Sequence, residues 1–487
     1  MSREVRALAG AAGAALAVSA AAVCSAARPA SAAPRIAQEA PRSAAEAPSA
    51  APGALRLAPG ALRVAPGALR VAPGAPRLAP GALRLAPGAL RVVPGALRVA
   101  PGAPRLAPGA PRISPERLPY GATGWAESGW GGVRGVTIGP IENLRHPDRG
   151  YGTAASGRAM DEAVAMGATW VSLTPFGRVW DGKGTGVDLV FEAPFEENRR
   201  NVLEAIAQAH ARGLKVLLVP HLWVESGEWR ALIDPGDDAG WARWAESYRR
   251  FLLTWAEVAR EGGAEMLSVG VELRSWVTTP RAASFLPIIE AVRRAYPGLL
   301  TYSANWDDVE HTLIFDALDL IGINAFYPLA EREGASFEEL LSGGRKVAAG
   351  VDAVARAWGK PVLLTEIGYT TRRDPAVRPW EWPDRMKDVV VDQRSQAEAY
   401  AAVMAPFLDA RSCAGFFVWR LYADPDDVSQ EAEWGFSPRG KLAELVLRDA
   451  FSTRWAADGP WLPGEALGRH RARTPGVFGW ELDPDEP

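Results

Sequence analysis

The 487-residue sequence predicts an α/β fold, a (β/α)8 (TIM) barrel formed by the chain after residue 117. First, short apolar runs alternate with amphipathic stretches that have the period of a helix. Second, there are eight such runs, and eight parallel strands close a barrel. Third, all 19 tryptophans lie between Trp125 and Trp480, in the same part of the chain. An open doubly wound sheet is the competing fold, but no G-x-G-x-x-G sequence follows the first run, which argues against its dinucleotide-binding form.

The expected elements follow from this alternation. We expect a barrel domain at residues 117–454 and a peripheral tail, rich in Pro, Gly and charge, at residues 455–487. We expect strands at residues 133–139, 170–175, 215–223, 266–273, 300–306, 318–326, 361–368 and 413–419. We expect helices at residues 157–166, 196–212, 241–261, 280–296, 344–358 and 393–408.

Residues 1–33 are expected to form a signal peptide. Arg3 and Arg6 make a short basic region, and residues 8–23 make an Ala-rich apolar stretch that is too short to span a membrane comfortably. An A-x-A cleavage sequence ends at Ala32, which predicts a secreted or envelope-associated protein. Cys24 offers a lipid-anchored alternative, although the residue before it is larger than lipoprotein processing prefers. An ordinary Ala-rich disordered start is the remaining interpretation.

Residues 34–116 are expected to be a low-complexity, disordered linker. Within them, residues 52–114 repeat the heptad Pro-Gly-Ala-Leu/Pro-Arg-Leu/Val-Ala nine times. A coiled coil is excluded, because a proline in every heptad removes a helical hydrogen bond and the glycine after it weakens the helix further. The repeat is typical of an extended, partly polyproline-II stalk. It is either a spacer that presents arginines at regular intervals or a repeat without a selected function.

Charge is divided unevenly along the chain. Residues 1–117 carry 15 Arg and 4 Glu, a net of +11, and the whole chain carries −3, so residues 118–487 carry −14. This division favours a stalk that contacts an anionic envelope and a body that acts on an oligosaccharide or polysaccharide, and it argues against a nucleic-acid enzyme. Only Cys24 and Cys413 are present, so removal of the signal peptide leaves no internal disulfide. Five scattered histidines predict no metal site; we expect no cofactor and a monomer.

Two glutamates end two of the expected strands. Glu272 follows Met-Leu-Ser-Val-Gly-Val, and Glu366 lies within Val-Leu-Leu-Thr-Glu-Ile-Gly. A carboxylate at the end of a buried strand is costly without a purpose, and the strand ends of a barrel converge on one rim. Two such carboxylates are the minimum that hydrolysis of a glycosidic bond requires. Either glutamate alone could instead form a structural salt bridge, with Arg274 or Arg420.

Polar and aromatic side chains end the other expected strands at the same rim. An indole suits a sugar site because its flat face stacks on a pyranose while its N–H bonds a hydroxyl group. His221 fits either a pocket or a satisfied core position. Asp307 and Asp308 are expected as a helix N-cap pair, and Glu225 and Glu228 as solvated loop residues. The expected substrate-binding residues are His221, Trp223, Asn305, Trp306, Asn324, Tyr327 and Trp419.

Three segments together resemble a known group of enzymes. They are Ser-Val-Gly-Val-Glu272-Leu, Gly-Ile-Asn-Ala-Phe-Tyr327-Pro and Leu-Leu-Thr-Glu366-Ile-Gly-Tyr. They are similar to clan A, the TIM-barrel retaining glycosidases, and in particular to glycoside hydrolase family 113, whose characterised members are β-1,4-mannanases. The resemblance runs from about residue 133 to about residue 451. It implies Glu272 as acid/base, Glu366 as nucleophile, Tyr327 beside the nucleophile and Trp419 under the sugar that is cleaved.

One position departs from the pattern of the clan. Much of the clan has Asn immediately before the acid/base glutamate, where it binds the substrate 2-hydroxyl, but this sequence has Val271. We therefore expect a retaining endo-β-1,4-mannanase-like hydrolase that is tethered to the envelope, and we keep three alternatives. They are the same barrel acting on another β-glycan, a non-catalytic carbohydrate-binding barrel, and a structural envelope protein whose stalk is the functional part.

Overall fold

The computed structural model describes residues 124–141 and 145–459. The expected signal peptide, the repeat linker and residues 460–487 of the expected tail lie outside the described residues. Within the described part, no helix combines the length and apolar character that would be needed to cross a membrane.

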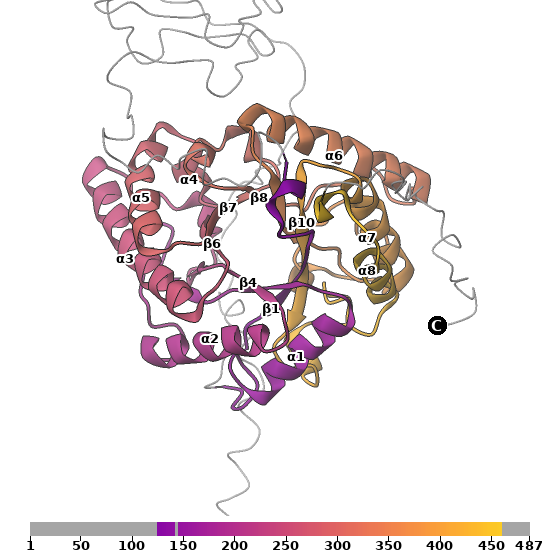
Figure 1. Cartoon of the computed structure of the whole chain (residues 1–487), viewed down its shortest axis with the longest axis horizontal. Coiled ribbons are helices and arrows are strands. Elements are labelled where there is room, and N and C mark those ends of the chain that lie inside the picture. Colours follow the sequence, from indigo (N-terminus) through magenta and orange to yellow (C-terminus); the bar gives the residue numbers. More distant parts are fainter. Residues whose placement is uncertain (1–123, 142–144, 460–487) are drawn as a thin grey trace, which may run out of the picture. The chain divides into compact units, whose positions relative to one another are not determined.

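Eight parallel strands close a barrel, which confirms the predicted (β/α)8 architecture. The strands form an inner ring and the helices lie outside it (Figure 1). Around the ring the order is β1-β10-β9-β8-β7-β6-β4-β2, so the last strand pairs with the first. The strands are β1 (Val133–Gly139), β2 (Trp170–Leu173), β4 (Lys215–Leu218), β6 (Met266–Val271), β7 (Leu299–Asn305), β8 (Ile321–Asn324), β9 (Val362–Ile367) and β10 (Cys413–Tyr422).

Two expected strands are shorter than predicted because prolines interrupt them. Pro175 follows β2 closely and Pro220 follows β4, and a proline has no N–H to donate to the ladder. Beyond these prolines the chain forms a separate parallel pair, β3 (Phe176–Val179) and β5 (His221–Val224). The expected strand at 215–223 is therefore two strands, and its second half leaves the barrel sheet.

Helices cover the outside of the barrel. The helix α6 begins at a capping box, in which Ser336 accepts from the backbone of Glu339 and the Glu339 carboxylate accepts from the backbone of Ser336. It ends at Gly359, whose φ of 62° suits a residue without a Cβ. The helices are α1 (Ala154–Ala165), α2 (Phe195–His210), α3 (Asp238–Gly262), α4 (Arg274–Val277), α5 (Leu286–Ala295), α6 (Phe337–Trp358), α7 (Gln393–Leu408) and α8 (Leu442–Ser452).

The helix α6 starts seven residues earlier than the sequence predicts. Gly343 and Gly344 lower the helix propensity there, but both lie inside the helix. A Cβ at Gly343 would collide with the carbonyl of Leu329, and one at Gly344 with the carbonyl of Ala402 in α7. Close packing therefore needs these glycines and outweighs their weak propensity.

Residues that follow α8 pack against two strands of the barrel. Trp455 is buried, and its ring stacks on Phe416 of β10 with 4.8 Å between centroids. The Arg134 guanidinium of β1 lies 4.2 Å from the centroid of the Trp455 ring and pairs with Asp458 at 2.7 Å. Residues 455–459, which the sequence analysis assigns to the tail, thus pack on β1 and β10.

Candidate active site

Glu272 follows β6 directly and is almost fully buried. Its backbone N–H donates to the carbonyl of Ser303 in β7 at 2.9 Å. Its φ is 52°, in the left-handed region that non-glycine residues rarely adopt and that costs on the order of 1 kcal/mol. The strand therefore ends at Val271, and at Glu272 the backbone leaves the extended conformation. Strain of this kind clusters at functional sites.

Three side chains hold the Glu272 carboxylate by hydrogen bonds. Trp229 Nε1 donates to Oε2 at 3.0 Å, and Arg230 Nη1 donates to the same oxygen at 2.8 Å. Asn324 Nδ2, at the end of β8, donates to Oε1 at 3.0 Å. Both carboxylate oxygens thus have donors, as an ionised carboxylate requires.

Glu366 lies next to this network on β9. The register of β8 and β9 places Asn324 opposite Glu366, and the N–H of Ala325 donates to the carbonyl of Glu366 at 2.7 Å. The Asn324 amide oxygen accepts from the Thr365 hydroxyl at 2.9 Å, which fixes the orientation of the amide. The Glu366 carboxyl is buried, and Asn324 is the one hydrogen-bond donor among the described residues that lowers its pKa, whereas Glu272 has three donors.

This difference in partners separates the acidities of the two carboxyl groups. Burial alone would raise the pKa of Glu272, but the charge of Arg230 and the three donors outweigh it and hold that pKa below its usual value. Burial, followed by the negative charge of Glu272, raises the pKa of Glu366 to about 8. Burial and the negative charge of Glu272 therefore favour the protonated form of Glu366, while the donors around Glu272 favour its ionised form. This order is the reverse of what the implied roles of acid/base and nucleophile require.

His221 lies in the same charged environment. It begins β5, is buried, and packs against Phe176 with 5.2 Å between ring centroids. Burial, followed by the positive charges of Arg230 and Arg420, lowers the pKa of His221 well below its usual value. The imidazole is therefore neutral at physiological pH and can bind a hydroxyl group without adding charge.

Trp419 lies near the end of β10. It is 6% exposed, and its indole N–H has no partner among the described residues. The peptide bond between Trp419 and Arg420 is cis, and the Arg420 guanidinium lies 4.8 Å from the centroid of the indole ring. Because a buried N–H without a partner is costly, this donor is available for a ligand.

Tyr327, which the family resemblance places beside the nucleophile, packs against Trp306. Its hydroxyl forms no hydrogen bond to Glu366 or to any other residue in the described part of the chain. The ring packs edge-on against Trp306, with 5.6 Å between centroids. Burial raises the pKa of Tyr327, so its hydroxyl stays protonated at neutral pH. Nonlocal packing with Trp306 thus sets the direction of this side chain.

Trp223 and Asn305 have other residues as their contacts. Trp223 belongs to the separate strand β5, is 49% exposed and packs edge-on against Phe176 and Phe191. Asn305 donates from Nδ2 to Asp307 Oδ1 at 2.8 Å. Neither side chain contacts Glu272 or Glu366 through an observed hydrogen bond.

In the expected N-cap pair, Asp307 and Asp308, it is Asp308 that occupies the N-cap position of the short 3-10 helix Val309–His311. Arg274 pairs with both carboxylates, and neither caps a helix through its side chain. The salt-bridge alternative for Glu272 named Arg274 or Arg420, but the partner is Arg230.

Two loop carboxylates also differ from the expectation. Glu225 pairs with Arg178 at 2.5 Å and is not simply solvated. Glu228 is exposed as expected, and it accepts from the backbone of Gly182 at 2.7 Å.

Sequence reasoning missed Trp229 and Arg230. They lie in the loop after β5, and Arg230 begins a short 3-10 helix, Arg230–Leu232. The Arg274 guanidinium lies over the Trp229 ring, 4.8 Å from its centroid. Because neither residue ends a strand, the pattern of strand ends carries no signal for them.

The described residues contain no group of three or more His, Cys, Asp or Glu side chains that could hold a metal ion. The site offers a carboxyl pair with separated acidities, the donors Asn324 and Arg230, and the unpartnered indole N–H of Trp419.

A buried carboxyl pair beside an indole, at the C-terminal rim of a (β/α)8 barrel, defines the class of glycoside hydrolases. A comparison with protein-family models identifies the family within that class. The model of Glycoside Hydrolase Family 113 matches residues 145–441, and the chain belongs to this family. The match includes both glutamates and the whole loop that carries Trp229 and Arg230.

Solved structures agree with this assignment. The GH113 β-mannanase AaManA from Alicyclobacillus acidocaldarius, in complex with ManMIm, is 28% identical with a TM-score of 0.57; the match covers 66% of this chain and 97% of that chain. A complex of a GH113 β-1,4-mannanase is 24% identical with a TM-score of 0.55, over 66% of this chain and 100% of that one, and supports the fold alone. The comparison with curated protein sequences found no match.

Proposed function

We propose that the protein is a retaining endo-β-1,4-mannanase, with Glu272 as acid/base and Glu366 as nucleophile. The observation that carries the proposal is the pair of carboxyls at the ends of β6 and β9, with Asn324 between them. The substrate class rests on the similarity to the β-mannanase from Alicyclobacillus acidocaldarius, which extends over nearly all of that enzyme. The same barrel acting on another β-glycan is the alternative of the same class.

The proposed reaction is a double displacement. The Glu366 carboxylate attacks the anomeric carbon, the glycosidic C–O bond breaks, and Glu272 gives its proton to the leaving oxygen. Water then attacks the glycosyl-enzyme ester, Glu272 takes a proton from that water, and the Glu366 carboxylate leaves. Trp419 lies under the reacting sugar and offers its free indole N–H to a hydroxyl group.

In the unliganded site the protonated form is favoured at Glu366 more than at Glu272, so the proposed reaction needs a proton on Glu272 that substrate binding must bring there. Trp229 and Arg230 reach Glu272 from a loop, so a sugar that enters between them and the carboxylate breaks these two hydrogen bonds. Burial would then raise the pKa of Glu272 against a single remaining donor, Asn324, while the charge of Arg420 favours an ionised Glu366. Substrate binding thereby transfers the proton to the acid.

The acidity order of the unliganded site favours a second assignment, in which Glu366 is the acid and Glu272 the nucleophile. Leaving groups distinguish the two assignments. A variant without the acid retains activity on aryl glycosides with good leaving groups, since these need no proton, whereas a variant without the nucleophile is inactive on all substrates. The proposal expects Glu272→Ala to behave as the first kind and Glu366→Ala as the second. The opposite pattern would establish the second assignment.

The substrate is tested by the release of reducing sugar from glucomannan, galactomannan, linear mannan, xylan and β-glucan. Release from mannans that is absent in Glu366→Ala supports the proposed function. Release from xylan or β-glucan alone would identify that polymer, and not mannan, as the substrate. No release from any polymer, with retained binding, would favour the non-catalytic carbohydrate-binding alternative.

Val271 does not take the place of the missing asparagine. It is 3% exposed, packs in the hydrophobic core and has no hydrogen-bonding group. The donor beside Glu272 is Asn324, which belongs to a different strand. We propose that Asn324 is the amide that hydrogen-bonds the substrate 2-hydroxyl once Glu272 is protonated.

We further propose that the protein is exported as a monomer and that its basic stalk contacts an anionic envelope polymer. The net charge of +11 on residues 1–117 supports this proposal. Fractionation of cells that express the full chain, or a chain without residues 1–116, tests it. Recovery of the full chain in the cytoplasm would contradict export, and loss of turnover without the stalk would favour the structural alternative.

A further inference from the structure

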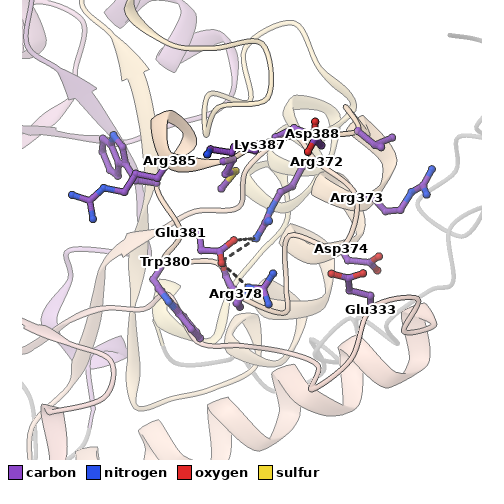
Figure 2. Close-up of a pocket in the computed structure, with 14 residues that line it drawn as sticks. Glu333, Arg372, Arg373, Asp374, Arg378, Trp380, Glu381, Arg385, Lys387 and Asp388 are labelled. Carbon is purple, nitrogen blue, oxygen red and sulfur yellow. Dashed lines mark hydrogen bonds and ion pairs between the residues drawn. The ribbon is translucent and has the colours of Figure 1, made fainter. Parts of the chain in front are cut away.

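A second concave feature lies on the long loop between β9 and α7. It is a pocket of about 660 Å³ lined by Glu333 and by residues between Arg372 and Val390 (Figure 2). Neither Glu272 nor Glu366 lines it. The pocket is therefore separate from the carboxyl pair, although the loop that forms it begins just after β9.

A row of aromatic rings connects the rim of the barrel with this pocket. Trp306 follows the last residue of β7 and meets Tyr327 edge-on. On its other side it stacks on Trp380, with 5.2 Å between centroids and 23° between ring planes. Trp380 lines the pocket and is 46% exposed. Trp306 thus stacks on one face of Trp380, and the indole remains nearly half exposed where it lines the pocket.

Charged side chains surround this indole but nearly cancel one another. The lining has five basic side chains, at Arg372, Arg373, Arg378, Arg385 and Lys387, and four acidic ones, at Glu333, Asp374, Glu381 and Asp388. The lining is thus nearly neutral, which favours an uncharged ligand over a polyanion.

Two of the arginines fix one acid in place. Arg372 and Arg378 point toward Glu381 (Figure 2) and pair with its two carboxylate oxygens at 2.8 and 2.6 Å. The Glu381 carboxylate is therefore held beside Trp380 with donors already arranged around it. The Nε of Arg372 is buried and has no hydrogen-bond partner among the described residues. A rigid set of donors and acceptors next to an exposed indole is the arrangement that recognises sugar hydroxyls.

We propose that the Trp380 pocket is a remote binding site for a neutral β-linked glycan, occupied by a distant part of the polysaccharide whose backbone is cleaved at the carboxyl pair. This inference rests on the proposed function for the identity of the glycan. A sugar ring stacks on the free face of Trp380, and its hydroxyls bond Glu381 and the arginines. Trp306, which follows β7 directly, stacks on Trp380, so the pocket adjoins one of the strand ends of the barrel rim.

The test measures binding in the full chain with Glu366→Ala, which keeps the polymer intact. Migration in native gels that contain galactomannan or glucomannan gives the dissociation constant. Trp380→Ala should weaken binding by roughly three- to tenfold, as loss of one aromatic contact does, and Trp380→Phe should restore part of it. Leu445→Ala is the matched control, because Leu445 is also 46% exposed but lies on α8, and it should bind as the parent does.

The outcomes separate this site from the proposed function. Equal binding by the parent and Trp380→Ala overturns the site, even if the active protein hydrolyses mannan. Weaker binding by Trp380→Ala supports the site, even if the active protein hydrolyses no polymer. Binding only to a carboxylated polysaccharide, or to no polysaccharide, overturns the proposal of a neutral glycan. Thermal unfolding of each variant shows that a loss of binding does not come from a loss of fold.

Discussion

Asn324 joins the two carboxyl groups of the site. Its amide nitrogen donates to Glu272, and its position on β8 is opposite Glu366 on β9. Because Thr365 fixes the amide oxygen, the nitrogen is directed to Glu272 and not away from it. The relative acidities of the two carboxyls therefore depend on the donors around Glu272. Among these donors, Arg230 lowers the pKa of Glu272 most.

Replacement of Arg230 by Gln should shift the pH dependence of kcat/KM to higher pH. The Arg230 charge lowers the pKa of Glu272 and also opposes the protonation of Glu366. Its removal therefore raises both pKa values, and both limbs of a bell-shaped profile move in the same direction. Profiles on a mannan oligosaccharide check this, with Arg230→Lys as the variant that keeps the charge.

Arg281 provides the control for this experiment. It pairs with exposed Asp238, so Arg281→Gln removes the same charge at a distance and should leave the profile in place. A profile for Arg230→Gln that matches the parent would show that Arg230 does not set the acidity of the pair.

Glu366→Gln should become more stable relative to the parent as the pH rises. The unfolded carboxyl has a pKa near 4.5, and in the fold the pKa is about 8, so the folded state binds more protons between these values. The parent then loses stability as the pH rises through this window, by up to about 1.4 kcal/mol for each pH unit, whereas glutamine does not titrate. Urea denaturation at pH 5, 6, 7 and 8 measures the difference.

Other groups also titrate in this window, but they cancel in the comparison. The lowered pKa of His221 makes the fold more stable as the pH rises toward 6.5, in the parent and the variant alike. The lowered pKa of Glu272 contributes stability that is lost only at acid pH, below about 4.5. A constant difference between the parent and Glu366→Gln from pH 5 to 8 would show that Glu366 is ionised in the free protein.

Trp419→Phe should lower kcat/KM about tenfold while the fold is retained. Phenylalanine keeps most of the buried ring but has no N–H, so a hydroxyl group of the reacting sugar loses its donor, at a cost of about 1–1.5 kcal/mol. Steady-state kinetics and thermal unfolding together check this. A variant that loses stability but keeps kcat/KM would make Trp419 a core residue only.

The barrel and its carboxyl pair could be predicted because their signal is local. Parallel strands buried on both faces are continuous apolar runs, and Glu272, Asn324 and Glu366 each end such a run. Their meeting at one rim follows from the topology alone. Trp229 and Arg230 could not be predicted, because the path of their loop depends on the separate pair of strands β3 and β5 that the sequence analysis missed.

The positions of two further side chains could not be predicted from the apolar runs alone. The expected strand at 215–223 includes Trp223, but Pro220 ends the ladder and carries Trp223 to the second sheet. The Tyr327 ring packs edge-on against Trp306, and its hydroxyl forms no hydrogen bond to Glu366 in the described part of the chain. The position of Trp223 thus follows from a proline that is close in sequence, whereas the direction of Tyr327 depends on packing against a segment that is distant in sequence.

The end of the folded unit gives the last prediction. A chain that ends at residue 454, the boundary expected from sequence, should be less stable than one that ends at residue 459. The shorter chain lacks Trp455, whose burial against Phe416 is worth about 3–5 kcal/mol, and it leaves the Arg134 guanidinium without Asp458. These two losses share Arg134 and will not add fully. Urea denaturation of both chains should differ by at least about 3 kcal/mol, and Asp458→Asn in the longer chain isolates the ionic part. Equal stability of the two chains would mean that residues 455–459 only cover a barrel that is already closed by β1 and β10.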